Sequence, residues 1–263
     1  MLGEFEQQAA SDQLWQCWQS GTVISELPAD RRPSSRGEGY AIQARLMRRT
    51  ALPLFGWKIA ATSVAGQKHI NVAGPQAGRI LAERVVPDGA TITLGANRMR
   101  VAEAELAFRL ARDLPPRAAD YSEAEVSAAI GTLHPSIEVP DSRYSDFTKV
   151  GEAQLIADNA CAHVFMLGAA TTADWRSLDL AAHPATGAIA ARGLRHQGKG
   201  ANVLGGPMIA MTWIANELSR LGVGLKAGEI VTTGTLVTPV PLQEGDELIA
   251  DFGALGSVSL RFK

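Results

Sequence analysis

The sequence predicts an α+β protein. A small, mainly helical N-terminal region, residues 1–70, precedes a strand-rich domain with a mixed, rolled β core, residues 71–263. Two observations support this prediction. Apolar residues before residue 50 recur at helical spacing, whereas short strand-like segments alternate with Gly- and Pro-containing turns after residue 70. These strands follow one another closely instead of alternating regularly with helices, which disfavours a Rossmann sheet and favours a barrel-like or rolled one.

Composition and charge narrow the class of protein. The chain has 263 residues, of which 46% are hydrophobic, and a formal net charge of −2, which is an ordinary globular balance. It has no dense Lys/Arg block and no apolar run of the roughly 18 residues that a membrane span needs. The N-terminus is unlike a secretory signal, and two cysteines suggest no disulfide framework. We therefore expect a cytoplasmic protein without a nucleic-acid or membrane partner.

Two helices and a strand are expected in the N-terminal region. Residues 4–20 and about 38–50 both place apolar side chains at roughly helical spacing. The stretch ALPLFGWKIAATS indicates a turn that leads into a short strand, because Pro and Gly interrupt it and Trp57 and Ile59 alternate with Lys58. A further helix is expected over TSVAGQKHINV.

The second domain is expected to contain a few helices among its strands. Ser122 and Glu125 form a capping box that predicts a helix start, and GEAQLIADNACAHVF indicates a helix followed by a strand. Pro207 and Gly222 bound the clearest helix. Its apolar face is expected to consist of Ile209, Trp213, Ile214 and Leu218. Short strands are expected in AGRILAERVV, ATITLG, RVAEAELAFRL, PSIEVPD, EIVTTGTL, DELIADFG and GSVSLRF.

The stretch RVAEAELAFRL contains two acids, Glu103 and Glu105, in apolar surroundings. In a strand the two side chains would point to the same face, whereas in a helix they would lie about 200° apart and could not cooperate. Its Ala- and Glu-rich composition favours a helix by propensity, so both structures stay open at this point. A solvated strand face or helix surface is the simpler interpretation of the pair alone.

A third acid favours a shared site. Glu138 lies between Ile137 and Val139 in a short apolar strand, where a buried carboxylate would require a partner. Three carboxylates from two strands would form an all-oxygen site suited to Mg²⁺ or Mn²⁺. The five histidines show no metal-ligand spacing, which argues against zinc. Lys58 is the other candidate: in a desolvated pocket it would transfer protons or hold a carboxylate, and otherwise it would extend to solvent.

Several segments together resemble a known family. They are GWKIAATS, the ExE of AEAELAF, IEVPDSR, IADNA, the VLGGP helix with WIANEL, and the ending AGEIVTTGTL…GDELIADFGALGSVSLRF. In this order they are similar to 2-keto-4-pentenoate hydratase and its sister 4-oxalocrotonate decarboxylase, within the fumarylacetoacetate hydrolase superfamily. The resemblance covers nearly the whole chain, including the helical N-terminus.

This resemblance implies a mixed β-roll with a small N-terminal domain, a bound divalent cation and a homo-oligomer, or a hydratase–decarboxylase complex. It implies catabolism of aromatic compounds by meta-cleavage, with a 2-hydroxydienoate or 2-oxo acid as substrate. The metal ligands would be Glu103, Glu105 and Glu138. The lysine of the GWK element would be Lys58. The hydratase reaction would add water to 2-hydroxypenta-2,4-dienoate, and a decarboxylase would use the same site.

The chain departs from this family at two positions. Ala73 stands where many members have an acid, and Cys161 replaces a small hydroxyl residue. Because an acid at position 73 could steer water or hold a lysine, its loss predicts a slower or differently selective enzyme, or a weakly active subunit of a complex. The acids expected to compensate are Asp141, Asp146 and Asp158.

Overall fold

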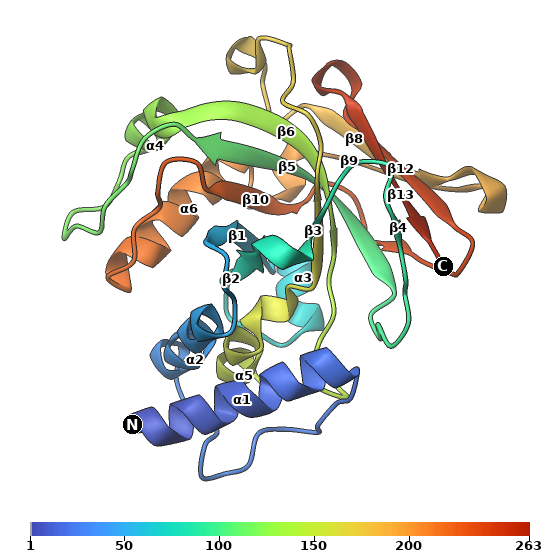
Figure 1. Ribbon diagram of the computed structural model, residues 1–263. Coiled ribbons are helices and arrows are strands. Elements are labelled where there is room, and N and C mark those ends of the chain that lie inside the picture. The colour runs from blue at the N-terminus through green and yellow to red at the C-terminus, as the bar shows by residue number, and fades with distance from the viewer. Residues whose placement is uncertain (1) are drawn as a thin grey trace.

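The computed structural model describes residues 2–263 and contains two β-sheets (Figure 1). The larger sheet has the order β2-β1-β10-β5-β6-β7-β3, and β11 pairs with β5 beside it. Its strands are β1 (Leu54–Ala60), β2 (Gln76–Leu81), β3 (Val85–Val86), β5 (Val101–Leu110), β6 (Ile130–Val139), β7 (Val164–Leu167), β10 (Ile230–Thr235) and β11 (Val240–Pro241). The pairs β1–β10 and β3–β7 are parallel and the other pairs are antiparallel, so the sheet is mixed, as predicted.

The smaller sheet has the order β4-β13-β12-β8-β9 and packs against β5 and β6 of the larger one. Its strands are β4 (Thr91–Ile92), β8 (Pro184–Ile189), β9 (Leu194–Lys199), β12 (Glu247–Asp251) and β13 (Ser257–Phe262). One continuous apolar core joins both sheets and includes Phe108, Ile137, Leu248 and Leu260. The predicted α+β class with a rolled β core is confirmed.

Six α-helices are present in the described residues 2–263. They are α1 (Glu4–Ser20), α2 (Arg36–Ala44), α3 (Val64–His69), α4 (Glu123–Ala129), α5 (Glu152–Ala157) and α6 (Pro207–Arg220). The predicted helix over 4–20 is confirmed, and the one expected at about 38–50 is α2 followed by a 3₁₀ turn, Arg45–Arg48. The capping box is also confirmed, because the side chain of each partner accepts a hydrogen bond from the backbone N–H of the other.

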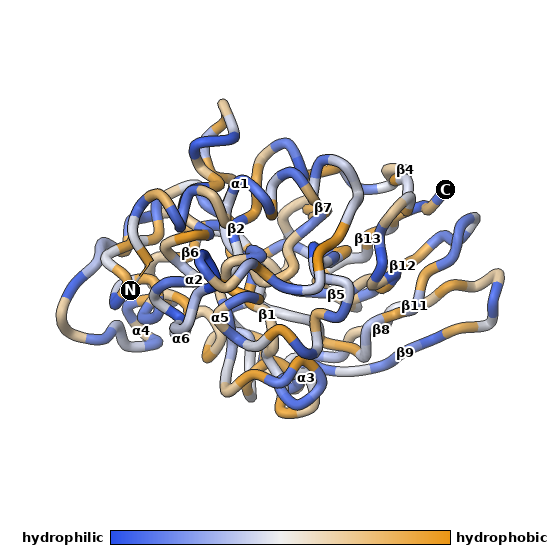
Figure 2. The backbone as a smooth tube through the Cα atoms, turned by 90° about the horizontal axis from the view of Figure 1, so that it is seen from below, coloured by the Kyte–Doolittle hydropathy of each residue, from blue (hydrophilic) through white to orange (hydrophobic). Residues whose placement is uncertain are grey.

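Two expectations about the elements were wrong or incomplete. Ile209 does not belong to the buried face of α6: it is 48% exposed, and Ala210 and Met211 are buried with Ile214 and Leu218. The hairpin of β8 and β9 was not predicted at all. Figure 2 shows why, because β9 is mostly hydrophilic and lies in a hairpin that projects from the rest of the chain.

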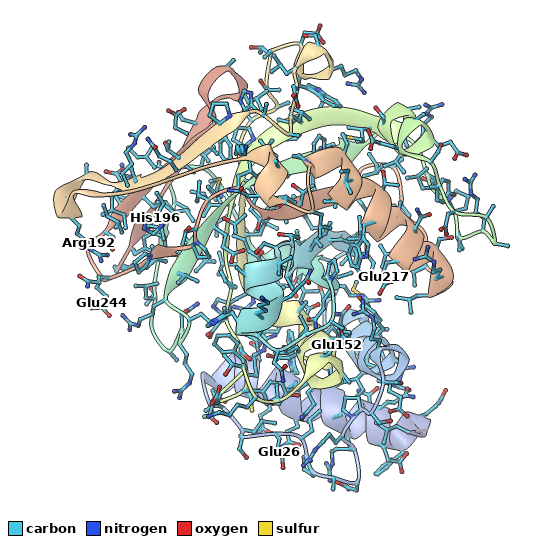
Figure 3. All side chains as sticks on the ribbon, turned by 180° about the vertical axis from the view of Figure 1, so that it is seen from behind. Glu26, Glu152, Arg192, His196, Glu217 and Glu244 are labelled. Atoms are coloured by element: carbon cyan, nitrogen blue, oxygen red, sulfur yellow. The ribbon has the colours of Figure 1, made fainter. Side chains whose placement is uncertain are left out.

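The N-terminal helices α1 and α2 pack with α5 at one end of the molecule, below the larger sheet in Figure 1. Arg36 of α2 connects this layer to the rest of the chain, because its guanidinium lies 2.6 Å from Glu152 of α5 and 2.6 Å from Glu217 of α6. Figure 3 labels both acids at this junction. Strand β1 precedes residue 70, yet it belongs to the larger sheet. The predicted domain boundary at residue 70 stays a prediction.

A buried ion pair fixes the segment that connects β6 to β7. The Asp158 carboxylate pairs with the Arg143 guanidinium, and it also accepts hydrogen bonds from Ser142 Oγ at 2.7 Å and from the backbone N–H of Arg143 at 3.0 Å. The guanidinium in turn lies over the ring of Trp18 on α1. The pair therefore joins the N-terminal helix to the loop that follows β6. No helix in the part of the chain described here is long and apolar enough to cross a membrane.

Replacing Asp158 with Asn should destabilise the fold strongly. The Arg143 cation would then stay buried without its carboxylate, and breaking a buried pair in this way costs about 3–5 kcal/mol. Urea unfolding measures the loss. The matched control is Asp146→Asn, which removes a solvent-exposed acid paired with Lys149 and should leave the unfolding midpoint nearly unchanged. Equal midpoints for the two variants would contradict the anchoring role.

Candidate metal centre and active-site pocket

The register of β5 and β6 brings the three predicted acids together. Glu103 lies directly opposite Glu138, and Glu105 lies opposite Ser136, two residues along the same strand face. One carboxylate oxygen from each of the three glutamates lies within 4.8 Å of the others. The segment of the ExE is thus a strand and not a helix. Because Glu105 is 0% exposed, the simpler interpretation of the pair as a solvated surface is wrong for this acid, whereas Glu103 is only half-buried. Glu138 is 2% exposed, in line with its apolar neighbours.

Glu105 is held by the strand beside it. Its Oε2 accepts hydrogen bonds from Thr232 Oγ1 and, at 3.0 Å, from the backbone N–H of Gly234. The pairing of β10 with β5 shifts register between Thr232 and Thr235, which turns this N–H toward the carboxylate. Gly234 has φ +104, and a Cβ there would collide with the side chain of Thr62, so the position requires glycine. The bulge therefore orients Glu105.

Lys58 lies in the same buried cluster. Its Nζ is 3.0 Å from Glu138 Oε1 and donates a hydrogen bond to the carbonyl of Ala160 at 3.0 Å. Gly78 lies opposite it on β2, and a Cβ at that position would come within 3.0 Å of the lysine side chain. The lysine is 3% exposed, so the alternative in which it extends to solvent is wrong.

The carbonyl that Lys58 contacts belongs to an unusual turn. Asn159, Ala160 and Cys161 have φ angles of 55°, 49° and 61°, a left-handed conformation that costs non-glycine residues roughly 1–2 kcal/mol each. The Asn159 side chain holds the turn in place, because its amide accepts from Arg79 N at 2.6 Å and donates to Arg79 O at 2.8 Å. We did not predict this turn, and the only signal in the sequence was an asparagine within IADNA.

The cluster has three acidic side chains and only one basic side chain, so it lacks positive charge. Burial raises the pKa of Glu105 well above its usual value, and the neighbouring glutamates raise it further. Burial raises the pKa of Glu138 to about 7, although Lys58 opposes this. Burial lowers the pKa of Lys58, but the glutamate charges outweigh it, so the pKa lies above its ordinary value. One lysine does not neutralise three carboxylates.

The donor set fits a divalent cation. Within residues 2–263, the three glutamates form the one group of metal-binding side chains that the structure brings together. Two of their buried oxygens, Glu105 Oε1 and Glu138 Oε2, have no hydrogen-bond partner among the described residues. Carboxylate oxygens are the ligands that Mg²⁺ and Mn²⁺ prefer. A cation would satisfy these oxygens and balance the charge.

The cluster borders a cavity of about 650 Å³, a size typical of small-molecule sites. Residues that line it include Lys58, Gln76, Glu103, Phe147, Cys161 and Asn202. Cys161 is buried, which raises the pKa of its thiol to about 12. The thiol is therefore neutral and offers the cavity a weak hydrogen-bonding group.

The expected compensating acids do not line this cavity. Asp158 pairs with Arg143, Asp146 pairs with Lys149, and Asp141 accepts a hydrogen bond from the backbone N–H of Arg98 at 2.9 Å. Their role as a substitute for an acid at position 73 is therefore not supported by their positions. Ala73 itself is exposed and does not line the cavity, so its effect on rate stays a prediction.

Comparison with known proteins gives the family. The model of the fumarylacetoacetate (FAA) hydrolase C-terminal family matches residues 41–263. The chain belongs to the fumarylacetoacetate hydrolase family. The match begins before β1 and continues to the last residue, so it includes Lys58 and the three glutamates of the cluster.

Individual relatives in this family are similar over nearly their whole length. A 2-keto-4-pentenoate hydratase of Paraburkholderia xenovorans is 32% identical over 262 residues, which covers 98% of this chain and 95% of the relative. A 2-hydroxyhexa-2,4-dienoate hydratase of Comamonas testosteroni is 31% identical, over 95% and 94%. The structure of 4-oxalocrotonate decarboxylase from Pseudomonas putida G7 with magnesium and adipate has a TM-score of 0.90 at 27% identity, over 100% and 99%. The predicted resemblance is confirmed.

Removing one carboxylate should abolish cation binding without unfolding the chain. We expect wild-type protein to bind one Mn²⁺ per chain and the Glu105→Gln variant to bind none, because an amide retains the shape but not the charge. Electron paramagnetic resonance of free Mn²⁺ measures this. The melting temperature without metal should be unchanged or higher, since the variant removes a buried charge.

The control for this experiment is Glu123→Gln, which changes an exposed acid on α4 and should bind Mn²⁺ like the wild type. Undiminished Mn²⁺ binding by Glu105→Gln would contradict the assignment of this carboxylate as a ligand.

Proposed function

We propose that this protein is a divalent-metal-dependent hydratase that adds water to substrates of the 2-hydroxypenta-2,4-dienoate type. The observation that supports it most is the largely buried cluster of three glutamates and one lysine beside a cavity of small-molecule size. The family relatives support the same class, because hydratases of 2-oxo or 2-hydroxydienoic acids match nearly the full chain. The role would lie in meta-cleavage catabolism of aromatic compounds.

The chemistry that we propose separates into binding and proton movement. Glu103, Glu105 and Glu138 would hold Mg²⁺ or Mn²⁺, which supplies the positive charge that stabilises an anionic 2-oxo acid. Their positions are fixed by paired strands, so the acidic end of the substrate would be held in one orientation. The apolar part of the cavity, which includes Ile59, Val101 and Phe147, would exclude water from the remaining chain of the substrate.

Lys58 is the group that we propose for proton transfer. Its Nζ can deliver a proton to C5 of the dienol while the enol O–H proton is lost, which gives the 2-oxo-3-enoate without net change of atoms. Water then adds across C3=C4: its oxygen bonds to C4 and its proton goes to C3. Holding the substrate carboxylate is the other role for this ammonium.

A decarboxylase is the second candidate function. The observation that favours it is the TM-score of 0.90 with 4-oxalocrotonate decarboxylase, over the whole of this chain. Both reactions begin from a 2-oxo or 2-hydroxydienoic acid held by the same acidic cluster. A homo-oligomer, or a complex of hydratase and decarboxylase subunits, stays a prediction that accompanies either activity.

The direct test follows ultraviolet absorbance of 2-hydroxydienoates with and without Mg²⁺ or Mn²⁺, and identifies the product. We expect metal-dependent decay of 2-hydroxypenta-2,4-dienoate to a product that keeps all carbons and gains one oxygen. A product from 4-oxalocrotonate that has lost one carbon as CO₂ would instead identify a decarboxylase. No metal-dependent decay of either substrate would contradict both candidates.

Lys58→Met should slow turnover by roughly 10²–10⁴-fold, the usual contribution of general acid–base catalysis. Mn²⁺ affinity should change far less, because the three carboxylates remain and the variant removes a competing cation. The matched control is Lys149→Met, which removes an exposed lysine that does not line the cavity and should leave turnover unchanged. Normal turnover in Lys58→Met would exclude a catalytic role for the lysine.

A further inference from the structure

Gln76, the first residue of β2, is the one buried side chain in the cavity wall with both polar ends unpartnered. It is 0% exposed, and neither its Oε1 nor its Nε2 has a hydrogen-bond partner within residues 2–263. Buried polar groups are nearly always hydrogen-bonded, and an unpaired one is costly. Other buried amides follow this rule: Gln43 donates to two carbonyls, and Gln154 accepts from the backbone N–H of Leu27.

The sheet points this amide toward the reaction site. Gln76 pairs with Ala60, and Gly78 pairs with Lys58, so the side chains of Gln76 and Lys58 share one face of the sheet as diagonal neighbours. Such neighbours lie about 7–8 Å apart, within common reach of a small bound molecule. Both residues line the same cavity.

The backbone on either side of Gln76 is fixed by α2. The carbonyl of Pro75 accepts a hydrogen bond from Arg36 at 2.9 Å. The N–H of Ala77 donates to the Tyr40 hydroxyl at 3.0 Å, and the carbonyl of Ala77 accepts from Gln43 at 2.9 Å. The main chain is therefore hydrogen-bonded on both sides of Gln76, whereas the Gln76 side chain is not, an arrangement typical of a preorganised binding group.

The chemistry of the amide defines its ligand. One end only accepts and the other only donates, so a partner that satisfies both must itself donate and accept. A carboxylate cannot donate, an apolar chain can do neither, and a cation would be drawn to the nearby glutamates. Water and hydroxyl groups meet the requirement. In the proposed reaction, water is the reactant with this property, and the product carries its oxygen as a hydroxyl at C4.

We propose that Gln76 is a catalytic residue that holds the water molecule which adds to the substrate, and then the C4 hydroxyl of the product. This assignment rests on the proposed hydratase function. Oε1 accepts one O–H of the water and Nε2 donates to its oxygen, which directs a remaining lone pair toward C4. The amide stays neutral throughout: the water oxygen bonds to C4, and the proton that leaves it is balanced by the proton gained at C3.

The test separates tautomerisation from water addition. In the presence of Mn²⁺ and D₂O, nuclear magnetic resonance follows deuterium entry at C5 of 2-hydroxypenta-2,4-dienoate and formation of the 4-hydroxy product. For Gln76→Met, of similar length but without polar ends, we expect C5 exchange near the wild-type rate, hydration slowed on the order of 100-fold, and accumulation of the 2-oxo-3-enoate. KM should change little. Gln76→Asn, which keeps the amide on a shorter stem, should lose less than Gln76→Met.

Stability supplies an independent readout. Because Gln76→Met removes an unpaired buried amide, its melting temperature should equal or exceed that of the wild type, whereas a structural glutamine would lower it. The control for the chemical change is Gln16→Met on the exposed face of α1, which should alter neither step.

Equal hydration by Gln76→Met and wild type would overturn the assignment of Gln76 while leaving the hydratase function intact. Equal slowing of both steps would also overturn it, because the residue would then not act on water specifically. If the wild type performs no hydration, the proposed function itself fails, and the water-binding role fails with it.

Discussion

The structure depends on a cluster of three carboxylates and one ammonium on a single sheet face, in which Glu105, Glu138 and Lys58 are buried and Glu103 is half-buried. Charges of this kind are costly to remove from water, and one lysine leaves the cluster with excess negative charge. The raised pKa values of Glu105 and Glu138 express that cost. An enzyme site is a reason for a chain to retain such a cluster, because a bound cation both neutralises it and uses its geometry.

Much of the surrounding architecture maintains this arrangement. The bulge at Gly234 turns a backbone N–H toward Glu105, and the left-handed turn at Asn159–Cys161 supplies a carbonyl to Lys58. Helix α2 braces the start of β2 through Arg36, whose ion pairs also reach α5 and α6. The N-terminal helices are therefore more than an appendage: they hold one wall of the cavity in place.

The sequence predicted those parts of the site that depend on local periodicity. A strand would place Glu103 and Glu105 on one face, although their composition left a helix open, and the apolar neighbours of Glu138 indicated a buried acid. The distance between the strands could not be predicted, because register between β5 and β6 is set by pairing partners far apart in the chain. Gln76 was missed for a different reason: its importance lies in the absence of hydrogen-bond partners for its amide, which only the folded structure reveals. The left-handed turn was not predicted because its residues are not glycines, which are the usual sign of such a conformation. The β8–β9 hairpin was not predicted because its hydrophilic strand, β9, lacks a clear apolar pattern.

We propose that the three glutamates form one divalent-cation site beside the reaction cavity. Anomalous diffraction from crystals grown with Mn²⁺ tests it most directly. We expect a single strong peak with a carboxylate oxygen of Glu103, Glu105 and Glu138 each about 2.0–2.6 Å away. A Mn²⁺ peak bound elsewhere, or no peak between these carboxylates at saturating Mn²⁺, would contradict it.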